Sequence, residues 1–546
     1  MAARQPARTR TVRRLLTPTP EQATDRSGNA TPGLDMNPSP APESTASLRI
    51  AGARGRWTLL ATVLGSGVVL LGSTVTNIAL PRIGQDFDAG LGVLQWTVNA
   101  YMLTLAGLIL LGGSLGDRFG RRRVFVLGLV WFAVASLLCG LAPDTTTLIA
   151  ARALQGVGGA LLTPGSLAII EASFHPDDRP RAIGLWSGFG GIGAALGPFV
   201  GGWLVDGPGW RWTFVLSAVP ALLCVPVALR HVPESVGAPR QAAVARAGAG
   251  ARRGAGFDVP GAVLGALALA LVTYALTEAR DGGTVAVAAA VGGVVAGAAF
   301  LRVERRSGDP MMPPAVFSSR QFTAVNVITL CVYAGTGGFF FLTALQLQIV
   351  VGCSALAAGA AMLPNTALML LFSSHAGMLA QRLGPRAPLT AGPLVCGAGM
   401  LLMLRVGPGA SYVHDVLPAL LVMGAGMVVM VAPLTVTLLA SVDASNAGLA
   451  SGINNAAARA AGLVSVAALP LLVGMGPEAY RSDASFDASF GRAMPLCAVL
   501  LAVGASVAFL TLRRSATAPR ASHGHAHGWL MEPPLVSRFT RHQTVE

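Results

Sequence analysis

Residues 105–130 read LAGLILLGGSLGDRFGRRRVFVLGLV, in which a short charged segment joins two apolar runs. Each run continues beyond the quoted stretch to about 20 residues, the length of helix that crosses a hydrocarbon layer about 30 Å thick. The joining segment carries four arginines and one aspartate. We therefore expect two membrane-spanning helices connected by a positively charged loop.

The composition of the whole chain agrees with this local pattern. Apolar residues make up 53% of the 546 positions, charged residues only 12%, and the mean hydropathy is +0.60. A soluble globular protein carries about 25% charged residues, so this class is excluded. The net charge of +14 does not indicate a nucleic-acid partner, because the arginines are spread over short loops and form no continuous patch.

Apolar runs bounded by charges, glycine–proline clusters or polar turns predict fourteen spans. The first six spans, within residues 57–230, are 57–80, 92–112, 124–142, 147–170, 183–205 and 213–230. Two more spans, within residues 258–302, are 258–278 and 284–302. The last six, within residues 322–512, are 322–346, 355–379, 387–405, 416–438, 449–473 and 492–512. The predicted fold class is an all-α polytopic membrane protein.

The arginine distribution predicts which side each loop faces. With an even number of spans, 31 of the 39 basic residues fall on the side of the two tails and 6 on the other side. Because cytoplasmic loops carry the excess of arginine, we expect a protein of the plasma membrane with both termini in the cytoplasm. Residues 1–56 and 513–546 are expected to be disordered cytoplasmic tails. The C-terminal tail contains His523, His525 and His527, which we expect in a solvated segment; weak binding of a metal is the alternative.

The loop after the second span combines glycines with a single carboxylate. Small residues let helix ends approach closely, and Asp117 at a helix end can pair with an arginine and hold two helices together on one side of the membrane. Such a pair breaks when the helices move apart, so we interpret the loop as a gate. Its residues are Gly113, Gly116, Asp117, Arg118, Gly120, Arg121 and Arg122.

The fifth span carries small residues at regular intervals along one face. Glycines at these positions allow a close approach to a neighbouring helix, and proline permits a kink. The residues are Gly184, Gly193, Gly197, Pro198, Gly201 and Gly202. The residues that follow include Asp206, Trp210, Arg211, Trp212 and Phe214. We expect the indoles of Trp210 and Trp212 to lie at the membrane interface.

These motifs resemble those of the major facilitator superfamily. The loop is similar to the signature G-x-L-(A/G)-D-R-x-G-R-R, and a degenerate copy runs from Gly377 to Arg386 through Gln381-Arg382-Leu383-Gly384. The fifth span matches the antiporter pattern G-x8-G-x3-G-P-x2-G-G at every spacing. The resemblance implies two six-helix halves, and the extra central pair points to the fourteen-span drug:proton antiporters of that superfamily.

Two arginines lie inside predicted spans, where an unpaired charge is costly. Arg152 stands about one turn from the outer boundary, and its surroundings resemble the superfamily motif R-x-x-Q-G, which implies a role in coupling proton movement to substrate movement. Snorkelling to the interface is the alternative. Arg459 stands about three turns from the cytoplasmic side, where Asn454 and Asn455 are possible acceptors; a structural role is its alternative.

The resemblance implies a central cavity near the bilayer midplane. We expect its polar lining to consist of Asn77, Asn99, Tyr101, Arg152 and Gln155, and Arg459 is a further candidate for the lining. Walls suited to varied apolar ligands are expected from Phe339, Phe340, Phe341 and Met362, for each of which a core or lipid-facing place is the alternative.

One position departs from the subfamily pattern. The first span ends LGSTVTNIALP over residues 71–81, where the related exporters have an aspartate at the place of Gly72. A proton exchanger needs a titratable group, and without this acid the partner of Arg152 is open. The candidate proton carriers are Asp117, Asp206 and Glu278.

The function that this pattern predicts is proton-coupled export of small amphipathic organic compounds by alternating access. We find no enzyme motif and no nucleotide-binding loop in the sequence. The expected partners are lipid, a small-molecule substrate and protons, without cofactor, metal or nucleic acid; the sequence does not indicate an oligomeric state. The alternatives are an importer or facilitator of a small organic anion and a non-transporting scaffold or sensor.

Overall fold

The computed structural model describes residues 47–236, 258–280, 282–307, 310–442, 447–476 and 482–512. Within these ranges the chain is almost entirely helical, and the β-type pairing that they contain is an isolated bridge between Leu48 and Phe174. The predicted C-terminal tail, with its three histidines, and residues 1–46 lie outside the described residues.

The helices follow the predicted spans. The first six are α1 (Ala53–Asp86), α2 (Leu91–Phe119), α3 (Arg121–Gly140), α4 (Thr145–Ser173), α5 (Arg179–Asp206) and α6 (Arg211–His231). The central pair is α8 (Val259–Thr277) and α9 (Gly283–Arg306). The rest are α10 (Arg320–Ile349), α11 (Ala355–Ala361), α12 (Leu363–Leu383), α13 (Arg386–Leu402), α14 (Leu417–Leu439), α15 (Ala447–Leu472) and α17 (Asp483–Thr511). Short turns of other helix types lie at Pro314–Ser318, Met403–Arg405 and Tyr412–Val416.

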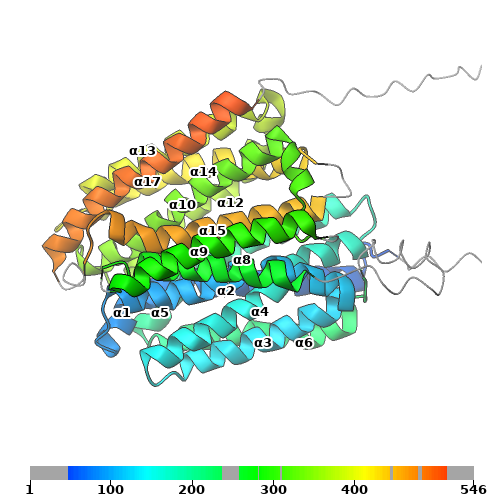
Figure 1. Cartoon of the computed structure of the whole chain (residues 1–546), viewed down its shortest axis with the longest axis horizontal. Coiled ribbons are helices and arrows are strands. Elements are labelled where there is room, and N and C mark those ends of the chain that lie inside the picture. Colours follow the sequence, from blue (N-terminus) through cyan, green and yellow to red (C-terminus); the bar gives the residue numbers. More distant parts are fainter. Residues whose placement is uncertain are drawn as a thin grey trace, which may run out of the picture. The chain divides into compact units, whose positions relative to one another are not determined.

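The helices form two groups with a hairpin between them. Helices α1 to α6 pack on one another, as do α10 to α17, and α8 packs against both α2 and α15. Figure 1 shows α8 and α9 in green between the blue-to-cyan and the yellow-to-orange helices. The groups contact each other directly through α5 with α11 and α12, α2 with α15, and α1 with α10 and α11. This arrangement confirms the predicted all-α fold with two inserted central helices.

The apolar runs account for the helices, since thirteen of those in the described ranges are long and apolar enough to cross a membrane. The fifth predicted span, α5, is a helix of 28 residues, which is also long enough. The predicted span 355–379 corresponds to α11 and the start of α12, which together form one candidate span over Ala355–Phe372. A turn at Met362 interrupts it, because Pro364 has no amide N–H to continue α11.

Capping side chains set several helix starts. The carboxylate of Asp144 accepts from Thr147 N at the start of α4, and Asp258 accepts from Gly261 N at the start of α8. Ser319 and Ser354 cap α10 and α11 in the same way. Each of these oxygens satisfies a backbone N–H that has no partner inside its helix.

Two matching turns relate the helix groups. Gly120 ends α2 with a φ of +107°, and Gly384 ends α12 with a φ of +75°. Each turn leads directly into the next helix, α3 or α13. A backbone in this region favours glycine, so the two copies of the loop motif share the residue that their geometry requires. The side chains of Gln381 and Arg382 lie outside the described ones.

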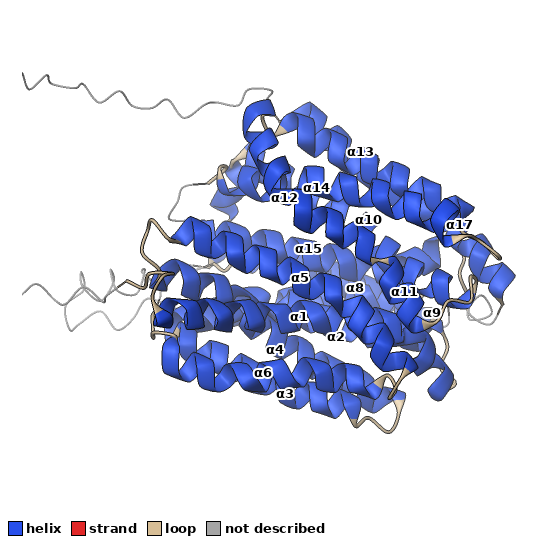
Figure 2. Ribbon diagram, turned by 180° about the vertical axis from the view of Figure 1, so that it is seen from behind, coloured by secondary structure: helices blue, strands red, loops and turns tan. Residues whose placement is uncertain are grey.

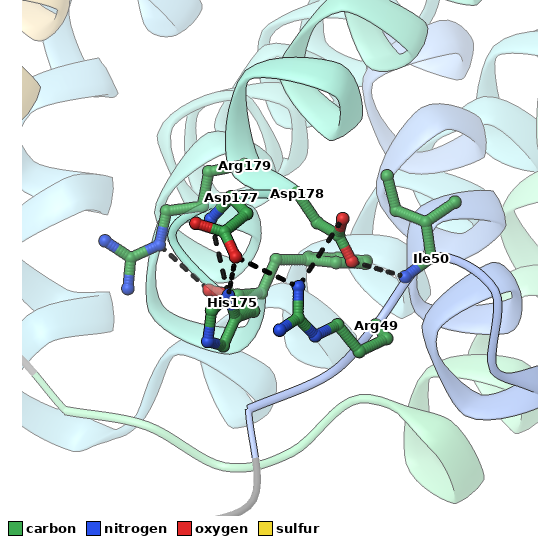
Figure 3. Close-up of polar contacts among 7 residues, drawn as sticks. Arg49, Ile50, His175, Asp177, Asp178 and Arg179 are labelled. Carbon is green, nitrogen blue, oxygen red and sulfur yellow. Dashed lines mark hydrogen bonds and ion pairs between the residues drawn. The ribbon is translucent and has the colours of Figure 1, made fainter. Parts of the chain in front are cut away.

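The first described residues are anchored to the end of α4. Leu48 N donates to Ser173 O, and His175 N donates to Leu48 O. Figure 3 shows Arg49 directed at two neighbouring carboxylates, with its Nη1 3.3 Å from Asp177 Oδ2 and 3.9 Å from Asp178 Oδ1. The predicted tail boundary at residue 56 is therefore too late, because residues 47–52 bond to the α4–α5 loop and α1 begins at Ala53.

The two ends of the helix bundle differ in how the groups meet. We name the end that holds Gly120 the inner end and the opposite one the outer end. The side-chain hydrogen bonds that join the two groups in the described ranges all lie toward the outer end: Gln95 to Val466 O, Gln348 to Ile78 O, and Asp206 to α11. Figure 2 shows α5 and α11 side by side there. The groups are thus joined at the outer end.

Candidate transport site

The inner loop is held by an ion pair within its own turn. Asp117 Oδ1 accepts from Arg121 Nε at 2.9 Å and lies 2.8 Å from Arg121 Nη2. The Nη1 of the same guanidinium donates to Ala168 O, 2.9 Å away on α4. Asp117 therefore positions an arginine that ties the α2–α3 turn to α4. This is the close approach that the motif predicts, although Asp117 and Arg121 bridge within one helix group.

A second carboxylate completes this loop. Glu234 Oε1 accepts from Arg122 N at 3.0 Å, and its Oε2 lies 3.6 Å from Arg122 Nε and 3.7 Å from Arg123 Nε. A Cβ on Gly120 would lie 2.6 Å from this carboxylate. Sequence reasoning missed Glu234, because it follows α6, more than 100 residues after the motif.

The other loop glycines differ in how tightly they pack. A Cβ on Gly113 would meet Pro164 at an ordinary 3.5 Å, and a Cβ on Gly116 would meet Arg121 at 3.9 Å. Gly112, one residue before the predicted motif, is the tight one, since its Cβ would lie 2.1 Å from Ala160 O. Arg118 lies over the Phe119 ring.

The glycine face of α5 makes the closest contacts between helices at the outer end. A Cβ on Gly197 would lie 2.3 Å from Thr74 Oγ1, and one on Gly201 would lie 2.7 Å from Val75, both on α1. A Cβ on Gly202 would lie 2.3 Å from Ala355 O on α11. From the other side, a Cβ on Gly359 would lie 2.0 Å from Pro198 O. The helices approach so closely that side chains do not fit between them.

The two remaining glycines of the α5 pattern do not take part in this contact. Nothing lies within 4 Å of a Cβ on Gly184, near the inner end. Gly193 belongs to a stretch of α5 whose side chains the structure does not describe. Among the glycines of α5 whose surroundings are described, close packing is therefore confined to the outer part of the helix.

Asp206 reinforces the outer contact. Its Oδ1 accepts from Ala355 N at 3.1 Å and its Oδ2 from Leu356 N at 2.8 Å, so the last residue of α5 caps the first turn of α11. Asp206 also lines a cleft of about 900 Å³ that opens at the outer end. Carboxylates at helix N-termini are stabilised by the free N–H groups and the helix dipole.

The tryptophan loop contributes to the same end. Trp210 is buried, and its Nε1 donates to Asp86 Oδ2 at 2.8 Å. Its expected place at the membrane interface is therefore wrong, because the indole is used to link α1 to α6. Trp212 is 53% exposed, as an interfacial residue requires.

Arg152 is fully buried and surrounded by neutral groups. Its Nε donates to Thr97 O at 3.0 Å, and its Nη1 donates to Gly72 O at 3.3 Å and to Gln155 Oε1. The guanidinium lies 4.3 Å from the centre of the Tyr101 ring. Because Arg152 reaches no surface, the snorkelling alternative is contradicted. Backbone carbonyls and an aromatic face take the place of an acidic partner.

None of the three candidate proton carriers meets Arg152. Asp117 pairs with Arg121, Asp206 caps α11, and Glu278 accepts from Trp96 Nε1 at 2.8 Å. Each of the three lies at a helix end whereas Arg152 lies between helices, so none of them is the acidic partner that Arg152 lacks.

The residues expected to line a cavity have different surroundings. Tyr101, Asn99, Arg152 and Gln155 are fully buried, so none of them lines an open cavity in this conformation. Tyr101 donates to Val69 O at 2.8 Å, and Gln155 Nε2 donates to Ser136 Oγ at 2.7 Å. Arg152, Gln155 and Tyr101 thus form one network with Thr97 and Ser136. Thr97 was not among the predicted site residues. Its place one helical turn before Tyr101, on the same face of α2, was the pattern that could have predicted it.

Two of these polar residues have unsatisfied amides. Neither the Oδ1 nor the Nδ2 of Asn99 has a hydrogen-bond partner, and the Oδ1 of Asn77 has none, in the part of the chain that the structure describes. Buried amides without partners are rare in folded proteins.

Arg459 is half-buried in the middle of α15. Within the described ranges it makes no hydrogen bond and no ion pair. The expected acceptors are engaged elsewhere: Asn454 Nδ2 donates to Thr329 Oγ1 on α10 at 2.7 Å, and Asn455 Nδ2 donates to Ser451 O.

The aromatic walls belong to the core of the second group. Phe339, Phe341 and Met362 are buried at 0%, 1% and 6% exposure, and only Phe340 is partly accessible. The core alternative therefore holds for Phe339, Phe341 and Met362 in this conformation.

A bundle of long apolar helices with one fully buried arginine and glycine-packed contacts at the outer end is typical of a membrane transporter. The chain belongs to the Major Facilitator Superfamily, whose family model matches residues 62–466. It is 35% identical to the puromycin resistance protein of Streptomyces alboniger over 78% of this chain and 83% of the relative. It is 34% identical to the tetracenomycin C resistance and export protein of Streptomyces glaucescens over 79% of each chain.

A solved structure supports the fold independently. The crystal structure of a peptide transporter POT in complex with sulfate superposes with a TM-score of 0.60 at 16% identity, over 86% of this chain and 99% of that one. Membership of the superfamily makes the protein a multi-pass membrane transporter and not an enzyme, with lipid and a small-molecule substrate as its partners.

Proposed function

We propose that this protein exports small amphipathic organic compounds of the antibiotic type across the plasma membrane by alternating access, with both chain ends in the cytoplasm. The resistance and export functions in the names of its relatives support this proposal. The arginine excess at the inner end supports the orientation.

The observation that carries the mechanism is the contact of α5 with α11. The glycines of α5 let the two helices meet backbone to backbone at the outer end, and Gly184 near the inner end has no close neighbour. A transporter closed on one side binds its substrate from the other side. We infer that this conformation faces the cytoplasm and that separation of α5 from α11 releases the substrate outside.

We assign the coupling proton to Asp206. Its deprotonated carboxylate accepts two backbone N–H groups of the opposite helix group, and it is accessible from the outer cleft. Protonation removes the negative charge that the N-terminus of α11 attracts. Acid on the outer side thereby weakens the closed state and favours opening outward. After the substrate has left, α5 meets α11 again and the carboxylate loses this proton toward the inner end, so that one proton enters as one substrate is exported.

Transport by reconstituted vesicles tests this proposal. Purified protein is inserted into liposomes with an acidic lumen, and the accumulation of fluorescein and of rhodamine 6G is measured after filtration, with protein-free liposomes as the blank. Wild-type protein is expected to accumulate at least one dye above the blank, and collapse of the pH gradient is expected to abolish this. Accumulation of neither dye, or accumulation that ignores the gradient, contradicts proton-coupled export.

A matched pair of variants tests the role of Asp206. Asp206→Asn keeps a capping oxygen but does not change charge with pH, so we expect uphill accumulation to be lost while downhill exchange continues. Asp88→Asn makes the same substitution in the same cleft, away from α11, and is expected to behave as wild type. Uphill transport by Asp206→Asn at the wild-type rate assigns the proton to another group.

A further inference from the structure

The charges inside the described bundle are of one sign. Each described carboxylate lies in a loop or within five residues of an end of its helix, as Asp117, Glu171, Glu304 and Asp487 do. Two arginines that are not exposed, Arg152 and Arg459, stand at least seven residues from either end of their helices. Because a charge in a low-dielectric interior acts over a long range, the bundle interior attracts anions and repels cations.

The two arginines differ in availability. Arg152 is fully buried, with donors bonded to Thr97 O, Gly72 O and Gln155. It raises the local positive potential but has no room for a ligand. Arg459 is partly accessible and has no hydrogen-bond partner among the described residues. A guanidinium inside the membrane with free donors is costly, and an anionic group is the partner that satisfies it best.

A second polar group faces the same region. One face of α2 carries Gln95, Asn99 and Met102, each about one turn from the next. The first and the last of these contact α15. Gln95 Nε2 donates to Val466 O at 2.7 Å, and Met102 Sδ lies 3.9 Å from a Cβ placed on Gly462. Asn99 between them therefore faces α15 about one turn outward from Arg459. Its amide is fully buried, with both polar atoms unpartnered.

An aromatic ring stands at the level of Arg459 on a neighbouring helix. A Cβ on Gly337 of α10 would lie 3.0 Å from Gly462 Cα on α15, and Tyr333 and Arg459 each stand about one turn inward from these two glycines. Tyr333 is 36% exposed although it stands halfway along α10. Flat faces beside a guanidinium accommodate an aromatic body next to an acidic group.

We infer that Arg459 and Asn99 form the substrate subsite and that it takes small organic anions, in which one carboxylate or acidic phenol adjoins an aromatic body. Arg459 donates to the negative oxygen, the Asn99 amide donates to the second oxygen after a small separation of α2 from α15, and Tyr333 contacts the aromatic body. This inference rests on the proposed export function and names the chemical class of its substrate.

Binding of two dyes of opposite charge tests the inference separately from transport. Fluorescein and rhodamine 6G share a xanthene ring system and differ in charge at pH 7.5. Their dissociation constants are measured by fluorescence anisotropy with purified full-length protein in detergent. We expect fluorescein to bind more tightly than rhodamine 6G. Arg459→Gln is expected to weaken fluorescein binding about 10- to 100-fold, since charge-assisted hydrogen bonds are lost.

Two further variants keep the test decisive. Arg459→Lys retains the charge and is expected to retain most of the fluorescein binding, which excludes a folding defect at this position. Arg405→Gln removes an exposed arginine elsewhere and is expected to have no effect. Tighter binding of rhodamine 6G, no binding of fluorescein, or unchanged binding in Arg459→Gln overturns the anion assignment. These results leave gradient-driven export of a cationic dye intact, whereas fluorescein binding without gradient-driven transport would overturn only the proposed function.

Discussion

The contact between α5 and α11 yields a quantitative expectation for Gly202→Ala. The added Cβ would lie 2.3 Å from Ala355 O, 2.6 Å from Ala355 C and 2.6 Å from Leu356 Cα. All three atoms are backbone, so no side-chain rotation relieves the clash and the helices must move apart. The clash exists only while α5 touches α11, so the variant raises the energy of the outer-closed state and leaves the open state unchanged.

The size of this effect follows from the cost of overpacking. One methyl group forced into a closely packed contact costs about 1–3 kcal/mol. If the whole cost falls on the closed state, the ratio of open to closed protein rises about 5- to 150-fold. Gly184→Ala on the same helix adds the same methyl group where nothing lies within 4 Å, so we expect no shift there.

A native cysteine reports on this opening. Cys353 lines the outer cleft and is half-buried, and burial raises the pKa of its thiol. At neutral pH this lowers the fraction of thiolate, the form that reacts with maleimides, and labelling accelerates as the pH rises. Opening of the cleft exposes the thiol and brings its pKa back toward the ordinary value. Gly202→Ala is therefore expected to label faster at Cys353 than wild type or Gly184→Ala. Equal labelling rates in all three proteins would refute the proposed closure.

Two further substitutions are informative. Gly72→Asp places a carboxyl group near Arg152, because a Cβ there would lie 3.5 Å from Gln155 Nε2 and 3.2 Å from Phe132, which must shift slightly. We expect the ratio of rhodamine 6G uptake to fluorescein uptake in vesicles to rise. An unchanged ratio would contradict the electrostatic argument. Asp117→Asn weakens the bond to Arg121 in the inner loop. Because Asp117 is half exposed, we expect less than about 1 kcal/mol in unfolding free energy but slower transport; Asp177→Asn is the exposed control, and equal rates would argue against a gating role.

The helices were predictable because lipid imposes one strong rule. Spans such as α3 and α9 need about 20 apolar residues with few charges, and this is visible without any knowledge of neighbours. The turn at Gly120 was readable for a similar reason, since its backbone conformation favours glycine. Arg152 and Arg459 were found because charge inside a span is rare.

The partners of these residues were not predictable. Asp206 bonds to Ala355 and Leu356, about 150 residues further along the chain, and no local pattern records that contact. The acidic partner expected for Arg152 proved to be backbone carbonyls, which every residue carries. Phe339 and Phe341 illustrate another limit: in a membrane bundle the core, the lipid face and a binding cavity are all apolar, so residue type does not separate them.

A reversible lock across the outer contact tests the central claim most directly. The variant carries Asp206→Cys and Ala355→Cys, which place two thiols where the carboxylate meets the α11 backbone. It also carries Cys353→Ser, which removes the native thiol of the outer cleft. Downhill dye exchange in vesicles is then compared before oxidation, after oxidation and after reduction of the same sample. We predict that the oxidised protein stops exchanging dye and that reduction restores exchange. Exchange at an unchanged rate with the disulfide formed would show that transport does not require α5 to separate from α11.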